Sequence, residues 1–261
     1  MAKLTFKRRE KKFLVSFEQY KSIIHELLDR GMEYDGYCAG GNTYRLYNIY
    51  FDSDTNRIIR SSVQHPKFKE KLRLRAYFLP RSDDDPVFLE IKRKIKGTVV
   101  KRRAAMSYGE AKEFIHCGCR PKTDDYMVNQ VLDEIEFYLK VYDVKPKVYL
   151  SYERVALFSR TDPDFRVTFD GNIISRRTQL DLFCEDRGES LLDDGELVME
   201  TKFSGAIPAW FCDILSKNKV YMSGFSKYGN EYTRYRGSDF LHLKDRPAPP
   251  IPRIGADKQI Q

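Results

Sequence analysis

Residues 72–76 read Leu-Arg-Leu-Arg-Ala, so apolar and cationic side chains alternate with a period of two. Successive side chains of a β-strand point to opposite faces, and this stretch therefore predicts a strand with one apolar and one cationic face. Residues 89–92, Leu-Glu-Ile-Lys, repeat the alternation with a carboxylate in place of one cation. The starting prediction is a sheet that is charged on one side and apolar on the other.

The same spacing of charges recurs along the chain. Each of these sets would lie on one face of a strand: Glu10-x-Lys12, Arg73-x-Arg75, Glu90-x-Lys92-x-Lys94, Lys101-x-Arg103, Arg166-x-Thr168-x-Asp170 and Glu200-x-Lys202. In an ordinary half-solvated sheet the charged face would point to water. In a closed sheet it would line a lumen, where neighbouring Arg and Lys repel one another unless an anion lies between them. Both arrangements fit the pattern.

Strands are predicted where β-branched and aromatic residues alternate between turn signals. They are expected at 6–15, 42–52, 69–79, 87–94, 98–106, 148–158, 165–170, 178–183 and 197–203. Gly97 lies between 87–94 and 98–106, which predicts a hairpin there.

Helices are predicted from caps and from helical spacing of apolar residues. Ser16 with Gln19 forms a capping box for a helix to about Arg30, and Ser107 with Glu110 forms another to about Cys117. Residues 124–142 carry apolar side chains at helical spacing, and Pro208 begins a short helix.

These elements predict a mainly β (α+β) fold. We expect a closed eight-stranded antiparallel tunnel or barrel with helices packed outside, because closure removes exposed strand edges. This domain would span residues 1–236. Residues 237–261 contain Pro-Ala-Pro-Pro-Ile-Pro-Arg and predict a Pro-rich, disordered tail.

Composition narrows the partners and the compartment. The 261 residues carry a net charge of +8, which favours polyanionic partners such as nucleotides, polyphosphate or an acidic membrane surface. The sequence has no apolar run near the ~18 residues of a membrane helix and no secretory signal, which predicts a cytoplasmic protein. The five scattered cysteines and isolated histidines predict neither a disulfide framework nor a zinc site.

Four motifs together resemble a known family. They are Tyr-Phe-Asp at 50–52, Leu-Arg-Leu-Arg at 72–75, Ser-Tyr-Glu-Arg at 151–154 and Phe-Ser-Lys-Tyr at 225–228. In this order they are similar to the catalytic domain of the vacuolar transporter chaperone (VTC) family, a branch of the triphosphate tunnel metalloenzymes. The resemblance covers about residues 6–236. It implies a polyphosphate polymerase that uses Mn²⁺ or Mg²⁺ and transfers the γ-phosphate of ATP onto a growing polyphosphate chain.

The resemblance also implies roles for individual residues. Phosphate binding and transfer would fall to eight cations: Lys12, Arg73, Arg75, Lys92, Lys101, Arg154, Arg166 and Lys227. Further substrate contacts would come from Glu10, Lys94, Arg103, Tyr152, Lys202 and Ser226. Glu200 would be the metal ligand, and ATP, polyphosphate, pyrophosphate and triphosphate would be the ligands.

The sequence departs from the superfamily in two respects. Tunnel triphosphatases and the related adenylyl cyclases typically open with Glu-x-Glu-x-Lys, whereas this chain has Arg8-x-Glu10-x-Lys12. A cation in place of a carboxylate favours holding a long polyanion over a two-metal hydrolytic site. The SPX domain and membrane spans of complete family subunits are also missing, so we expect either a membrane partner protein or release of polymer into the cytoplasm.

Other functions remain open at this point. A tunnel triphosphatase would hydrolyse tripolyphosphate or nucleoside triphosphates, and a non-catalytic module would bind polyphosphate or inositol phosphates. An RNA-binding protein is disfavoured, because the sequence has no RNP-type aromatic motif, no KH-type Gly-x-x-Gly loop and no Lys/Arg run. We therefore expect no nucleic-acid partner.

Overall fold

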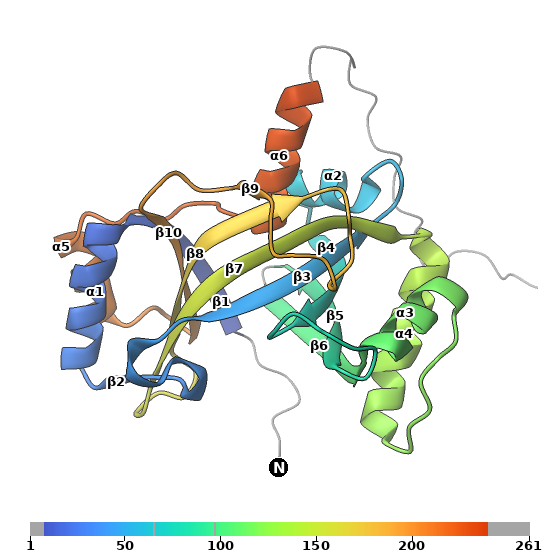
Figure 1. Cartoon of the computed structure of the whole chain (residues 1–261). Helices are drawn as coiled ribbons and strands as arrows, with labels where there is room; N and C mark the ends of the chain where they lie inside the picture. Colours follow the sequence, from blue (N-terminus) through green and yellow to red (C-terminus); the bar gives the residue numbers. More distant parts are fainter. Residues whose placement is uncertain (1–7, 65, 97, 240–261) are drawn as a thin grey trace, which may run out of the picture.

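The computed structural model describes residues 8–239 except 65 and 97 (Figure 1). Its long strands are β1 (Arg8–Ser16), β3 (Tyr44–Asp52), β4 (Phe68–Ala76), β5 (Pro86–Ile95), β6 (Thr98–Ser107), β7 (Lys145–Ser159), β8 (Arg166–Arg176) and β10 (Glu196–Ser204). Two short strands are β2 (Met32–Tyr34) and β9 (Glu189–Ser190). The helices are α1 (Phe17–Asp29), the 3₁₀ helix η1 (Gly36–Gly41), α2 (Arg57–Val63), α3 (Tyr108–Cys117), α4 (Tyr126–Tyr142), α5 (Ala209–Lys217) and α6 (Lys227–Asp239).

All strands form one sheet with antiparallel neighbours. The main path is β1-β10-β8-β7-β3-β4-β5-β6, with β2 paired to β7 and β9 to β8. The path has eight strands, as expected, but no ladder joins β1 to β6 within the described residues. The sheet is nevertheless strongly curled. Its curl brings β5 close to β1, where Nζ of Lys92 donates to the Glu10 carboxylate over 3.3 Å. The predicted antiparallel α+β class is confirmed. The predicted closed barrel is not, because β1 and β6, the two ends of the strand path, do not pair in the described residues.

The outer side of the sheet carries two apolar clusters under helices. One packs α1 and α5 against β1, β8 and β10 through residues such as Phe13, Val167 and Met199. The other packs α3 and α4 against β4, β5 and β6 through residues such as Leu72 and Leu89. Figure 1 shows these helix pairs at opposite ends of the molecule. The apolar residues of the alternation therefore point outward, which leaves the charged residues on the inner side.

The predicted helix starts are confirmed by their caps. The Ser16 hydroxyl accepts from the backbone of Gln19, whose side chain accepts from the backbone of Ser16. Ser107 and Glu110 make the same reciprocal pair at α3. The hairpin of β5 and β6 is also present.

One predicted strand is wrong. Residues 178–183 form bends and turns between β8 and β9. Gln179 has a φ of 50°, which a continuing strand does not allow. Leu180 and Leu182 instead pack into the apolar cluster under α3 and α4.

The expectation that all helices pack outside the sheet is corrected by α6. Tyr228 and Tyr232 of this helix lie in a third cluster with Leu46, Tyr50 and Tyr152, which belong to the inner side of the sheet. Helix α6 runs to Asp239, and the rest of the predicted tail lies outside the described residues. No helix of the described chain is long and apolar enough to cross a membrane.

Asp52 connects three elements at this end of the sheet. Its buried carboxylate accepts from the backbone N–H groups of Ile58 and Ile59 at the start of α2, over 2.8 and 2.9 Å. It also accepts from the Tyr228 hydroxyl of α6 over 2.9 Å. Burial raises the pKa of Asp52, and these donors oppose that shift.

Replacing Asp52 with Ala should lower the free energy of unfolding by about 3 kcal/mol, because three buried donors lose their acceptor. Urea denaturation measures the change. Asp54 is the matched control, since it is exposed and its contacts are surface ion pairs to Lys145 and Lys147; Asp54→Ala should leave the midpoint nearly unchanged. Equal losses in the two variants would refute the role of Asp52.

Candidate polyanion-binding face

The charged residues of separate strands meet on one side of the sheet. Residues that lie opposite each other in an antiparallel ladder share a face, and the register pairs Lys12 with Glu200, Arg73 with Glu90, and Arg154 with Asp170. We call this side the inner face. It carries Glu10, Lys12, Lys71, Arg73, Arg75, Glu90, Lys92, Lys101, Arg103, Tyr152, Arg154, Thr168, Asp170, Glu200 and Lys202.

Glu90 is the centre of one charge cluster. Its side chain is fully buried and accepts from Nε of Arg73 over 2.7 Å and from Nζ of Lys101 over 3.2 Å. Arg75 lies 4.0 Å from the same carboxylate. Burial favours the neutral acid, but Arg73, Arg75 and Lys101 outweigh it and hold the pKa of Glu90 well below its usual range. Glu90 therefore stays ionised and fixes these cations.

Asp170 is the centre of a second cluster. Arg154 donates to both of its oxygens, over 2.6 and 2.8 Å, and Lys227 of α6 donates to one of them. Burial opposes ionisation, but the two cations lower the pKa of Asp170 to about 2. The contact brings Lys227 onto the inner face although it comes from a helix. Two of the motifs that carried the resemblance therefore meet here.

Glu10 and Glu200 form the third cluster with three lysines. Lys12 lies 3.4 Å from Glu10 and 3.5 Å from Glu200, Lys202 lies 3.0 Å from Glu200, and Lys92 contacts Glu10. Burial opposes the charge of Lys12, but the two carboxylates outweigh it and raise its pKa. The lysines likewise lower the pKa of Glu200 against the effect of burial.

The inner face has more cations than carboxylates. In the three clusters eight cations share four carboxylates. Lys71 has no carboxylate partner among the described residues, and its Nζ lies 5.5 Å from the Tyr228 ring centroid. Burial, together with Lys92, Lys12 and Lys69, lowers the pKa of Lys71 to about 8. An external anion would neutralise this excess positive charge.

Two tyrosines add neutral groups to the cationic rows. The Tyr152 hydroxyl accepts from Nη2 of Arg75 over 2.8 Å, and the Tyr50 hydroxyl accepts from Nη1 of Arg73 over 3.2 Å. Burial opposes ionisation of Tyr152, yet Arg75, Arg154 and Lys227 lower its pKa to about 8. The shift shows how strongly the surrounding cations favour negative charge at this position.

The other residues predicted from sequence lie at the margins. Arg166 reaches the inner face on β8, but its guanidinium bonds to Asp35 before η1. The guanidinium of Arg103 lies 4.5 Å from the Phe88 ring centroid. Lys94 lies opposite Lys69 near the end of β5. The Ser226 hydroxyl accepts from the Gly229 backbone and so caps the first turn of α6.

Sequence reasoning missed Lys71, Tyr50, Glu90 and Asp170 as members of the site. Lys71 could have been found by extending the period of Arg73-x-Arg75 back by two residues. Glu90 and Asp170 belonged to the charged alternations, but their role in holding cations requires cross-strand register. Tyr50 lies opposite Arg73, which only the β3–β4 pairing reveals.

The donor set fits a divalent metal shared with phosphate. No group of three or more His, Cys, Asp or Glu that could hold a metal lies within the described residues. Mg²⁺ and similar ions commonly use one or two carboxylates plus substrate phosphate oxygens. Glu200 would supply one carboxylate, and its register partner Thr168 has a hydroxyl that is buried without a hydrogen-bond partner in the described part of the chain. That hydroxyl is suited to a metal-bound water or a phosphate oxygen.

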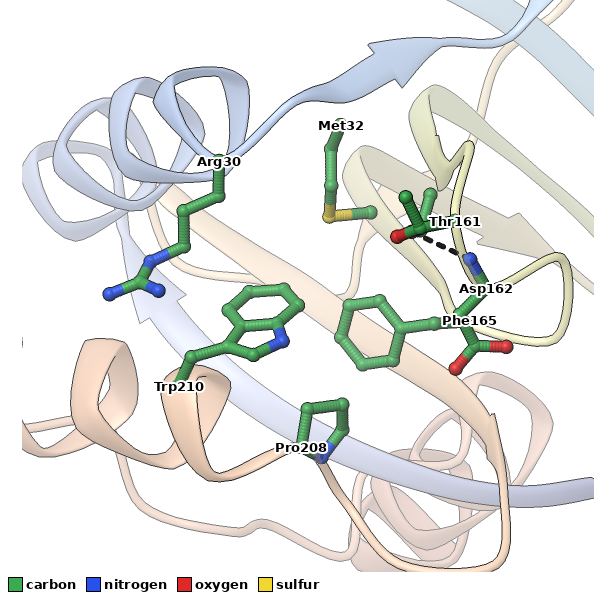
Figure 2. A pocket seen from close by; sticks show the side chains of 8 residues that line it. Arg30, Met32, Thr161, Asp162, Phe165, Pro208 and Trp210 are labelled. Atoms are coloured by element: carbon green, nitrogen blue, oxygen red, sulfur yellow. Dashed lines mark hydrogen bonds between the residues drawn. The ribbon is translucent and has the colours of Figure 1, made fainter.

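A cavity of about 370 Å³ lies apart from these charges (Figure 2). Met32, Phe165 and Trp210 line it, and they belong to or pack against the outer cluster beneath α1 and α5. Arg30 and Asp162 are its charged residues. One cation and one carboxylate do not make a polyanion site, so the inner face remains the candidate.

The curled antiparallel sheet and the excess of inner cations are the features that define this chain's candidate site. The chain belongs to the VTC domain family, which matches residues 7–235. No curated protein matches the chain. The family confirms the resemblance drawn from the four motifs.

Two solved structures are similar to this chain at low identity. A candidate adenylate cyclase from Bacillus halodurans is 18% identical, with a TM-score of 0.49, over 85% of this chain and 96% of that chain. A protein from Pyrococcus horikoshii is 12% identical, with a TM-score of 0.43, over 87% of this chain and 99% of that chain. Neither likeness bears on activity.

Lys71→Met should stabilise the empty protein at pH 7 by about 1–2 kcal/mol. Lys71 has a pKa of about 8 when folded and an ordinary value of 10.5, so the folded state binds the proton more weakly. The free-energy cost of keeping Lys71 charged in the folded state is therefore fully present below pH 8 and disappears as the pH rises to 10.5. Urea denaturation should therefore show that Lys71→Met raises the free energy of unfolding more at pH 7 than at pH 10.

Lys12→Met is the matched control on the same face. Because Lys12 pairs with Glu10 and Glu200, its loss should destabilise the protein at pH 7. Destabilisation by Lys71→Met at both pH values would contradict the account of Lys71.

Proposed function

We propose that this protein is a metal-dependent polyphosphate polymerase that transfers the γ-phosphate of ATP onto a growing polyphosphate chain. One observation carries the proposal: on the inner face eight cations share four carboxylates. An extended polyanion can neutralise this excess along the whole face, and VTC domain membership supports the same ligand class.

Synthesis fits the arrangement better than hydrolysis. Glu90 and Asp170 are fully buried and are each engaged by two or more cations, so they act as counter-ions for the phosphate-binding arginines and lysines. Glu10 and Glu200 have side chains that are 13% and 8% exposed, and they remain for a metal, although each also pairs with two lysines. A two-metal hydrolytic site needs a richer carboxylate set.

The chemistry needs positioning and charge stabilisation more than covalent help. Buried carboxylates hold the guanidinium groups of Arg73 and Arg154, and Asn48 and Tyr152 hold that of Arg75. Little reorganisation is therefore required when phosphate binds. The terminal oxygen of polyphosphate is already anionic and can attack the γ-phosphorus without a general base. The new phosphoanhydride bond forms as the bond from the γ-phosphorus to the β–γ bridging oxygen breaks, and ADP leaves with that oxygen. Mn²⁺ or Mg²⁺ at Glu200 would neutralise charge on the triphosphate oxygens.

We further propose that the curled sheet works as a tunnel. The ladder does not join β1 to β6 in the described chain, but the contact between Glu10 and Lys92 links β1, at one end of the sheet, to β5, the neighbour of the strand at the other end. Side chains, and the bound polyanion between them, would then complete the wall.

Incubation of the protein with ATP and Mn²⁺ should yield polyphosphate chains visible by gel electrophoresis. Glu200→Gln should reduce the yield at least 100-fold, because the amide is a neutral, weaker metal ligand of the same shape. Glu18→Gln, on the exposed surface of α1, is the control and should retain activity. Release of orthophosphate alone would indicate a triphosphatase and overturn the proposal.

A further inference from the structure

An aromatic cluster lies at one end of the inner face. The ring centroids of Tyr37 and Tyr77 are 5.8 Å apart with an interplanar angle of 22°. Tyr44 lies 5.5 Å from Tyr37 and 6.3 Å from Tyr77, and Phe88 meets Tyr77 edge-on at 5.6 Å. We call Tyr37, Tyr44 and Tyr77 the tyrosine stack. The mechanism above uses none of these rings.

The tyrosine stack continues the rows of phosphate-binding cations. On β3 and β7, Tyr44 lies directly opposite Arg154. On β4 and β5, Arg75 lies opposite Phe88, and Tyr77 follows two residues after Arg75. A ligand lying along the inner face therefore passes from guanidinium groups to aromatic rings.

Tyr37 is exposed, yet its backbone is fixed. Its side chain is 69% exposed, while its backbone N–H donates to the Asp35 carboxylate over 3.2 Å. Asp35 is itself held by Arg166 and by a bond from its N–H to the Ala156 carbonyl over 2.9 Å. The adjacent Cys38 is buried and its sulfur accepts from the Ala156 N–H. A ligand that stacks on this ring would lose little affinity to ordering the loop.

We propose that the tyrosine stack binds the nucleobase of the ATP donor, with its triphosphate on Arg154 and Arg75. The inference rests on the proposed function, since it concerns the same site. Aromatic rings beside a cationic groove bind bases by stacking on their π-faces. The γ-phosphate then points away from the stack, toward Arg73 and Lys71, which is where the acceptor chain must end. Arg166 acts through Asp35 as a positioning residue for Tyr37.

Calorimetric titration of the full chain with ATP and with tripolyphosphate, both with Mn²⁺, tests the proposal. Tyr37→Ala should weaken ATP binding about tenfold and leave tripolyphosphate binding unchanged, because only ATP carries a base. Tyr37→Phe should bind both ligands like the wild type. Tyr221→Ala is the control for loss of an exposed tyrosine, since Tyr221 is 79% exposed and lies outside the cluster.

The outcomes separate the two proposals. Unchanged ATP binding in Tyr37→Ala, or equal losses for both ligands, would overturn the nucleobase site and leave the phosphate site standing. If the wild type binds neither ligand, the proposed function fails, and the nucleobase site fails with it.

Discussion

The structure depends on an imbalance of charge that four carboxylates of the inner face hold in place, three of them buried. Glu90 and Asp170 are fully buried, and neighbouring cations hold the pKa of each well below its usual value. Glu90 fixes Arg73 and Lys101, and Asp170 fixes Arg154 and Lys227. Without these carboxylates the cations would repel one another and leave the inner face. With them, the face keeps a net positive charge in a low-dielectric setting. The affinity for a polyanion and the instability of the empty face have the same origin.

The fold tolerates this charged face because most of its hydrophobic core lies on the outer side of the sheet. Most apolar residues of the sheet pack outward against α1 and α5 or against α3 and α4, while inner-side residues such as Leu46 and Leu150 pack with α6. The inner face therefore need not supply the hydrophobic stabilisation that an ordinary barrel interior provides. Helix α6 is the exception, since it places Lys227 on Asp170 and Tyr228 on Asp52. The first turn of α6 thus connects the Asp170 cluster to Asp52, which binds the first N–H groups of α2.

The sequence predicted most strands because their alternation is local, and it predicted α1 and α3 because their capping boxes are local. It did not predict α2, whose first N–H groups are bound by Asp52 from the preceding strand rather than by a residue at the cap position. Residues 178–183 alternate like a strand but pack their leucines into a cluster instead of pairing. Whether the sheet closes depends on contact between its two edge strands, which period-two patterns cannot specify.

The most direct test of the account is the melting temperature of the protein with added tripolyphosphate or with sulfate at matched ionic strength. A polyanion that bridges several cations of the inner face should raise the melting temperature saturably, because it binds only the folded state. Sulfate should do much less, since it cannot span several clusters at once. Equal shifts from the two anions would mean that the charges act as an ordinary solvated surface, and would contradict the account.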